Sequence, residues 1–116
     1  LNPYIAEAHY NLGNVLKAIG NLQEAEISYR KAINIKPDLA EAHYSLGAIL
    51  SAFGKIDEAI LSYNRSLNIK ENMPQALVAL GNSLLNKGQY VKALNLLKKG
   101  DGTISFDLEK GMYIYQ

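Results

Sequence analysis

The chain has 116 residues, of which 48% are hydrophobic and 20% are charged, and its formal net charge is +1. This composition is typical of a soluble folded protein. It argues against general electrostatic binding to nucleic acid or to a membrane surface, which requires clustered lysines and arginines. The absence of cysteine excludes disulfides and thiolate zinc sites and fits a reducing compartment, so we predict a cytoplasmic location.

The sequence repeats itself. Residues 6–13 read AEAHYNLG and residues 40–47 read AEAHYSLG, and over the whole period residues 6–39 match residues 40–73 at 17 of 34 positions. A weaker third copy begins at Pro74. A sustained period in this range is typical of a solenoid, in which one supersecondary unit is stacked on copies of itself.

The first repeat predicts two helices joined by a tight turn. From Ala6 onward, apolar residues at helical spacing predict one inner stripe: Ala8, Leu12, Val15, Leu16 and Ile19. Gly20 is expected to end this helix, because glycine accepts the left-handed conformation after a helix end. Asn21 and Glu24 resemble a capping box at the start of a second helix. The inner stripe of that helix is Leu22, Ala25, Tyr29, Ala32 and Ile33.

The next two repeats predict helices at residues 40–53, 56–69, 74–86 and 90–99. Asp38 is a candidate cap for the first of these, and Asn72 or Met73 for the third. Residues 100–102 read Gly-Asp-Gly and are expected to end the last helix. We therefore predict an array over residues 1–100, with repeats at about 6–39, 40–73 and 74–100, and a tail at residues 101–116.

The residue pattern of the tail differs from that of the repeats. Residues 103–108 alternate apolar and polar side chains, residues 109–111 suit a turn, and residues 112–116 are rich in strand formers, which predicts a β-hairpin. A short capping helix broken at Gly111 and a disordered tail are the alternatives. A hairpin here is also expected as the first element of a following domain. Residues 1–3 (Leu-Asn-Pro) resemble the repeat junction at residues 35–37 (Ile-Lys-Pro) more than a natural start, which predicts that the chain is a piece of a longer repeat protein.

The pattern resembles the tetratricopeptide repeat over about residues 1–99. The family's small residue between the two helices of a repeat is matched by Gly13, Gly47 and Gly81, and the small residue facing it by Ala25, Ala59 and Ala93. Its large aromatic is matched by Tyr29 and Tyr63, with Leu97 in the third repeat, and its final proline by Pro37 but not by Glu71. Where the family usually has tryptophan, this chain has His9, His43 and Leu77. The resemblance implies an all-α fold of antiparallel helix pairs stacked in a right-handed superhelix.

The same resemblance implies that the first helix of each repeat lines a concave groove that holds an extended peptide or a partner helix. The residues it places there are Glu7, Tyr10, Asn11, Asn14, Lys17, Glu41, Tyr44, Ser45, Ala48, Ser51, Gln75, Val78, Ala79, Asn82 and Leu85. Amide side chains hydrogen-bond a peptide backbone, and tyrosines supply rigid contact area. A merely solvated face is the alternative for this set, which we call the predicted groove residues.

The residues that carry two specialised binding activities of the family are mostly absent from this sequence. Cochaperone repeats hold a peptide's terminal carboxylate with lysine, asparagine and arginine, but the matching places here are Tyr10, Asn14, Ser45, Gln75 and Ala79, of which only Asn14 agrees. The asparagine ladder in front of O-linked N-acetylglucosamine transferases is matched by Asn11 alone, with Ser45 and Ala79 at the next rungs.

No other motif predicts chemistry. His9 and His43 are one repeat apart without a carboxylate or cysteine cluster of ligand spacing, so we interpret them as packed imidazoles at an aromatic position. The Gly-rich run at residues 100–103 follows a helix and lacks a P-loop lysine, and no catalytic triad motif is present. We predict no metal, no cofactor and no enzymatic activity.

The sequence therefore predicts a protein-interaction scaffold that binds a protein or peptide and neither nucleic acid nor membrane. A substrate-recruiting array of a larger enzyme, such as a glycosyltransferase or oxygenase, is one alternative. Self-association through an exposed last helix, with Leu94, Leu96 and Leu97, is another.

Overall fold

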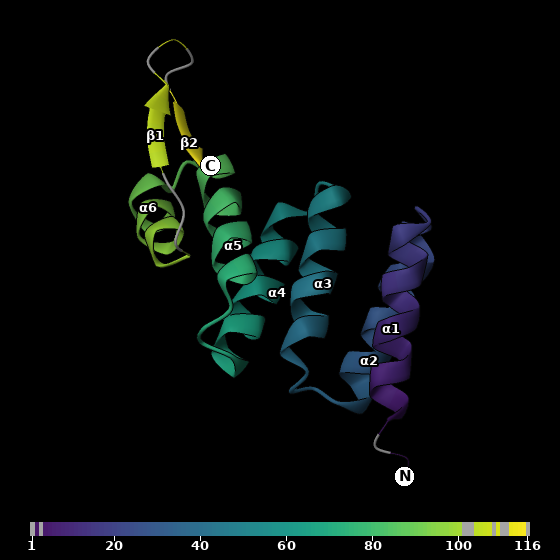
Figure 1. Ribbon diagram of the computed structural model, residues 1–116. Coiled ribbons are helices and arrows are strands. Elements are labelled where there is room, and N and C mark those ends of the chain that lie inside the picture. Colours follow the sequence, from purple (N-terminus) through teal and green to yellow (C-terminus); the bar gives the residue numbers. More distant parts are fainter. Residues whose placement is uncertain (1, 3, 101–103, 108, 110–111, 116) are drawn as a thin grey trace. The chain divides into compact units, whose positions relative to one another are not determined.

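The computed structural model describes residues 2, 4–100, 104–107, 109 and 112–115. The chain divides into two compact units, Leu1–Glu71 and Asn72–Gln116. The first unit contains α1 (Ile5–Ala18), α2 (Leu22–Ile35), α3 (Ala40–Ala52) and α4 (Ile56–Ile69), and the second contains α5 (Pro74–Asn86), α6 (Tyr90–Lys99), β1 (Ile104–Asp107) and β2 (Met112–Tyr115). Helices pack in sequential pairs, α1 with α2, α3 with α4 and α5 with α6 (Figure 1).

Each helix pair is joined by the same backbone turn. Gly20 has a φ of 86°, its N–H donates to the carbonyl of Lys17 at 3.0 Å, and the N–H of Asn21 donates to the carbonyl of Leu16 at 2.8 Å. This pair of bonds is a Schellman motif, which closes the last turn of a helix with a residue in the left-handed conformation. Gly54 and Gly88 repeat the geometry after α3 and α5. The turn glycine predicted for the first repeat is therefore confirmed.

The two helices of each pair approach closely at a second glycine. A Cβ placed on Gly13 would lie 2.6 Å from Cε1 of Tyr29, and one on Gly47 would lie 2.6 Å from Cε1 of Tyr63. In the third repeat, a Cβ on Gly81 would lie 2.7 Å from Cγ of Leu97. The glycine and the large residue thus fill one space together, and the large residue is buried in all three repeats.

The two pairs of the first unit are joined through α2 and α3. Ala32 of α2, Leu39 of the connection and Ala42 of α3 form a buried apolar cluster, against which Tyr10 and Ile33 pack. Ser66 of α4 is also buried, and its hydroxyl donates to the carbonyl of Ala40 at 2.8 Å. The predicted inner stripe of α2 is confirmed, since each of its members is buried or half-buried.

The predicted inner stripe of α1 is wrong for most of its members. Leu12 is 49% exposed and Val15 is 58% exposed, and Ala8 and Ile19 are exposed as well. Only Leu16 is half-buried. One repeat later, the equivalent Leu46 of α3 is 5% exposed. The physical reason is position in the stack: α3 packs against α2 of the preceding pair, whereas α1 has no preceding pair among the described residues.

Two predicted helix caps are also absent. Asn21 holds the N-cap position of α2, but its side chain makes no capping bond. Its backbone N–H donates to the carbonyl of Leu16 to close α1, so it is not available to the Glu24 carboxylate as a capping box would require. The N-cap of α3 is Leu39 and not Asp38, because α3 begins at Ala40 and the N-cap is the residue directly before the first helical one. Met73 is the N-cap of α5, as one of the two predicted candidates.

The predicted hairpin is present. Strands β1 and β2 pair antiparallel, with Ile104 opposite Tyr115 and Asp107 opposite Met112, and β1 contacts α6 (Figure 1). Within the predicted turn, residues 110 and 111 lie outside the described residues. No helix among the described residues is long and apolar enough to span a membrane.

Candidate functional site

The predicted groove residues of the first unit lie on α1 and α3, and most of them are accessible. On α1, Glu7, Asn11, Asn14 and Lys17 are exposed and Tyr10 is half-buried. They share one helical stripe because their spacing follows the helical repeat. The α1 part of the predicted groove is therefore polar and largely open to solvent.

On α3 the predicted groove residues are less exposed. Tyr44, Ala48 and Ser51 are half-buried, and half-buried Glu41 approaches Lys70 with its carboxylate 3.5 Å from Nζ. Ser45 is only 5% exposed. The α3 stripe therefore offers a ligand chiefly the tyrosine ring and small side chains.

Each groove tyrosine rests on a buried tyrosine of the second helix in its pair. The ring centroids of Tyr10 and Tyr29 are 5.9 Å apart, with planes inclined by 45°, and those of Tyr44 and Tyr63 are also 5.9 Å apart, inclined by 39°. Tilted aromatic pairs at this separation are favourable. The ring packing restrains Tyr10 and Tyr44 before any ligand binds.

The hydroxyl of Tyr29 connects α2 to the groove face of α1. It donates a hydrogen bond to Oδ1 of Asn14 on α1 at 2.7 Å. Burial raises the pKa of Tyr29, a hydrogen bond from Ser45 of α3 lowers it, and nearby Tyr10 raises it. Asn14 is therefore bound to Tyr29 within the helix pair, and Asn11 is the amide on this face with a free side chain among the described hydrogen bonds.

Tyr63 occupies the buried position in the second repeat that Tyr29 occupies in the first. Burial and, to a smaller extent, the nearby Tyr44 together raise the pKa of Tyr63 to about 12, although a hydrogen bond from Ser51 partly opposes the shift. The neutral phenol is thus the form that the folded state favours.

We expect the folded state to lose stability in alkali through Tyr63. Its folded pKa lies above the ordinary value of 10.0, so its contribution is complete below that pH and is lost as the pH rises toward about 12. The loss should reach about 1 kcal/mol near pH ~11. Urea unfolding of the wild type and of Tyr63→Phe at pH ~9 and ~11 measures it: the stability difference between the two proteins should shift by that amount, and a constant difference would contradict the assignment.

The remaining predicted groove residues belong to α5 in the second unit. Gln75 and Asn82 are exposed, and Val78, Ala79 and Leu85 are half-buried. Val78 also contacts the end of its own helix pair, since a Cβ on Gly100 would lie 2.9 Å from Cγ2 of Val78.

The two histidines occupy different environments. His43 is buried, and its Nε2 lies 2.8 Å from the carbonyl oxygen of Pro37, so this nitrogen carries the proton that the carbonyl accepts. His9 of α1 is half-buried. Among the residues that the structure describes, no three or more His, Cys, Asp or Glu side chains are grouped so that they could hold a metal ion.

Comparisons with known proteins agree on the fold. A model of the tetratricopeptide repeat matches residues 4–72. Two solved structures, "Crystal structure of MamA" and "Crystal structure of MamA protein", are similar to this chain with TM-scores of 0.78 and 0.77 and sequence identities of 32% and 31%. The first alignment covers 82% of this chain and 56% of MamA, and the second covers 86% and 55%.

The chain thus spans just over half the length of either MamA structure. No curated protein matches it. The family model covers more than half of the chain, and its limits enclose both helix pairs of the first unit, with their glycine–tyrosine contacts. The chain belongs to the tetratricopeptide repeat family.

Proposed function

We propose that the chain is a non-catalytic interaction module that binds an extended segment of a partner protein along the first helices of its repeats. Repeats of this family are generally protein-interaction modules, which supports the class of function. The observation that carries the proposal is the pair of half-buried tyrosines, Tyr10 and Tyr44, held at equivalent positions one repeat apart by their buried partners. Aromatic side chains that are already ordered contribute contact area at low entropic cost.

Polar side chains beside these rings can bind a peptide backbone. Asn11 offers both a donor and an acceptor, and exposed Glu7 lies one helical turn before it. The net charge of +1 supports a binding mode that rests on shape and hydrogen bonds more than on charge.

Peptides selected from a displayed random library on the immobilised chain provide a ligand for the test. The double variant Glu7→Ala and Asn11→Ala should weaken binding of a selected peptide at least about tenfold, because each lost hydrogen bond is worth about 1 kcal/mol. These residues are better targets than Tyr10, which also packs against the core cluster. Fluorescence anisotropy measures the affinity.

Glu24→Ala serves as the matched control, since Glu24 is an exposed helical carboxylate on α2 outside the predicted groove. Its affinity should equal that of the wild type, and circular dichroism should show the same helicity for all three proteins. An unchanged affinity of the double variant would refute the assignment of this face.

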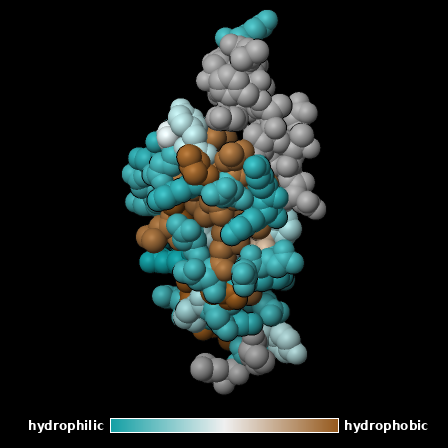
Figure 2. Space-filling model, turned by 90° about the vertical axis from the view of Figure 1, so that its left-hand side faces the viewer, coloured by the Kyte–Doolittle hydropathy of each residue, from teal (hydrophilic) through white to brown (hydrophobic). Residues whose placement is uncertain are grey.

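Self-association is a second candidate, and the exposed surface of α6 favours it. Figure 2 shows hydrophobic side chains exposed among hydrophilic ones on one face of the molecule. Val91 is 75% exposed and Tyr90 is exposed too, whereas Leu97, predicted to be uncovered, is buried. Light scattering of the wild type and of Val91→Asp decides this candidate: self-association predicts a larger species that the substitution dissociates, and a wild-type monomer removes it.

A further inference from the structure

An open groove lies between the second helices of the first unit, away from the predicted groove residues. It consists of two cavities of about 430 and 420 Å³ that share Ile33, His43 and Arg65. Side chains from α2, α3 and α4 line it, and none of them is among the predicted groove residues. Either volume is within the range of ligand pockets, roughly 300–1,000 Å³. We call this site the α2–α4 groove.

The floor of the α2–α4 groove is apolar and firmly held. Leu46 and His43 are buried, and the hydrogen bond between His43 and the carbonyl of Pro37 fixes the imidazole. Ile27 is 54% exposed at the edge, although it is a large aliphatic side chain. The floor can therefore accept an apolar side chain without rearrangement of the core.

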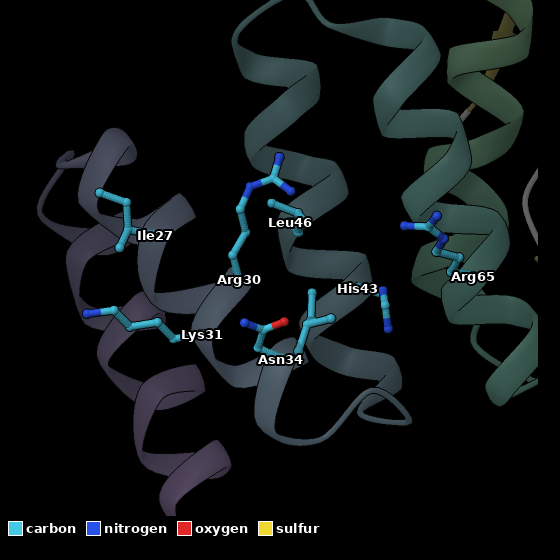
Figure 3. A pocket seen from close by; sticks show the side chains of 8 residues that line it. Ile27, Arg30, Lys31, Asn34, His43, Leu46 and Arg65 are labelled. Atoms are coloured by element: carbon cyan, nitrogen blue, oxygen red, sulfur yellow. The ribbon is translucent and has the colours of Figure 1, made fainter.

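The rim of the same groove is cationic. Figure 3 shows Arg30 of α2 and Arg65 of α4 on opposite sides of the space beside Leu46 and His43, with the Lys31 side chain beyond Arg30, on the side away from Arg65. Ile27, Arg30, Lys31 and Asn34 follow one another at helical spacing, so they form a single stripe. Lys31 and Arg65 stand at equivalent positions one repeat apart, and both line the first cavity.

The charge on this rim is poorly neutralised. No carboxylate is among the described residues that line either cavity. Nε of Arg30 is bonded to Glu26 at 2.8 Å, whereas the described part of the chain shows no ion pair for Lys31 or Arg65. Arginine and lysine beside an apolar surface favour a ligand that combines carboxylates with an aliphatic or aromatic side chain.

We propose that the α2–α4 groove is a second binding site, which takes a short acidic segment of a partner protein. An apolar side chain of that segment occupies the floor between Ile27 and Leu46, and flanking carboxylates pair with Lys31 and Arg65. Three cations around one cavity, on a chain of net charge +1, match a short segment better than the long phosphate backbone of a nucleic acid. The site is independent of the predicted groove on α1 and α3.

The test uses a fluorescein-labelled peptide that alternates glutamate with leucine and phenylalanine, titrated against the whole chain. Arg65→Gln combined with Lys31→Gln should weaken its binding about tenfold, and Ile27→Ser should weaken it about fivefold. Lys55→Gln is the matched control, because Lys55 is an exposed cation of the same unit that does not line the groove, and it should change affinity less than about twofold. Added salt should weaken the wild-type complex.

Two further probes define the ligand class. A peptide with serine in place of each leucine and phenylalanine should bind at least about fivefold more weakly, because the floor contact is lost, and an oligouridylate should not compete. Equal binding of the serine peptide would reduce the site to general charge attraction and overturn the proposal. Unchanged affinity of the Lys31 and Arg65 double variant, or competition by the oligouridylate, would overturn it too.

Discussion

Leu46→Ala should lower the free energy of unfolding by about 3 kcal/mol, whereas Leu12→Ala should lower it by less than about 1 kcal/mol. The two leucines hold the same position in successive repeats, yet Leu46 is 5% exposed and Leu12 is 49% exposed. Deleting a buried leucine leaves a cavity and removes apolar contacts, whereas an exposed leucine has few contacts to lose. Because the two substitutions are identical and their positions equivalent, a comparison of the two variants isolates the effect of burial on stability.

Urea unfolding followed by circular dichroism at 222 nm, the usual helix band, measures both variants. The wild-type chain with both leucines is the reference, and the shift of the midpoint at constant slope gives each loss of stability. Equal losses for the two variants would show that α1 is covered in solution on the face that the structure leaves open.

Gly47→Val should destabilise the chain by about 3 kcal/mol, the second large effect that we expect. A Cβ at this position lies 2.6 Å from Cε1 and 2.7 Å from Cδ1 of Tyr63, and the ring is buried and cannot turn away without disturbing Tyr44. The added methyl groups therefore force α3 and α4 apart. Gly47→Ala should cost less, since the gain in helix propensity of about 1 kcal/mol offsets part of the clash.

Ala52→Val is the control for this substitution, because Ala52 is exposed near the end of the same helix. It changes only helix propensity and should cost less than about 0.7 kcal/mol. Thermal unfolding of the three variants gives the order Ala52→Val, Gly47→Ala, Gly47→Val for increasing loss. A tolerated valine at residue 47 would mean that the close approach of α3 and α4 does not hold the pair together.

The repeat period was enough to predict the helices. Four of the six were predicted with the same bounds or within one residue, such as Ile56–Ile69 and Tyr90–Lys99, because glycine and proline mark the helix ends in the sequence itself. The family resemblance predicted a close helix approach at Gly13, Gly47 and Gly81 but placed the small residues Ala25, Ala59 and Ala93 opposite them. The nearest side chains in the structure are instead those of Tyr29, Tyr63 and Leu97.

Properties that depend on neighbours were harder to predict. An apolar stripe at helical spacing does not show whether another element covers it. For this reason Leu12 and Val15 were predicted to be buried, whereas in the structure they are exposed and only the equivalent Leu46 of the second repeat lies in the core. Ser45 was placed in the groove by register, but only 5% of its surface is exposed. Lys31 and Arg65 repeat in the sequence, yet only the packing of α2, α3 and α4 shows that they flank a cavity.

The most direct test of the proposed function is an NMR titration of the isotope-labelled chain with a library-selected peptide. The proposed groove predicts that amide shifts change along α1 and α3, with the largest changes near Tyr10, Asn11 and Tyr44. Changes confined to α2 and α4, around Lys31 and Arg65, would contradict the claim that the first helices carry the main binding face.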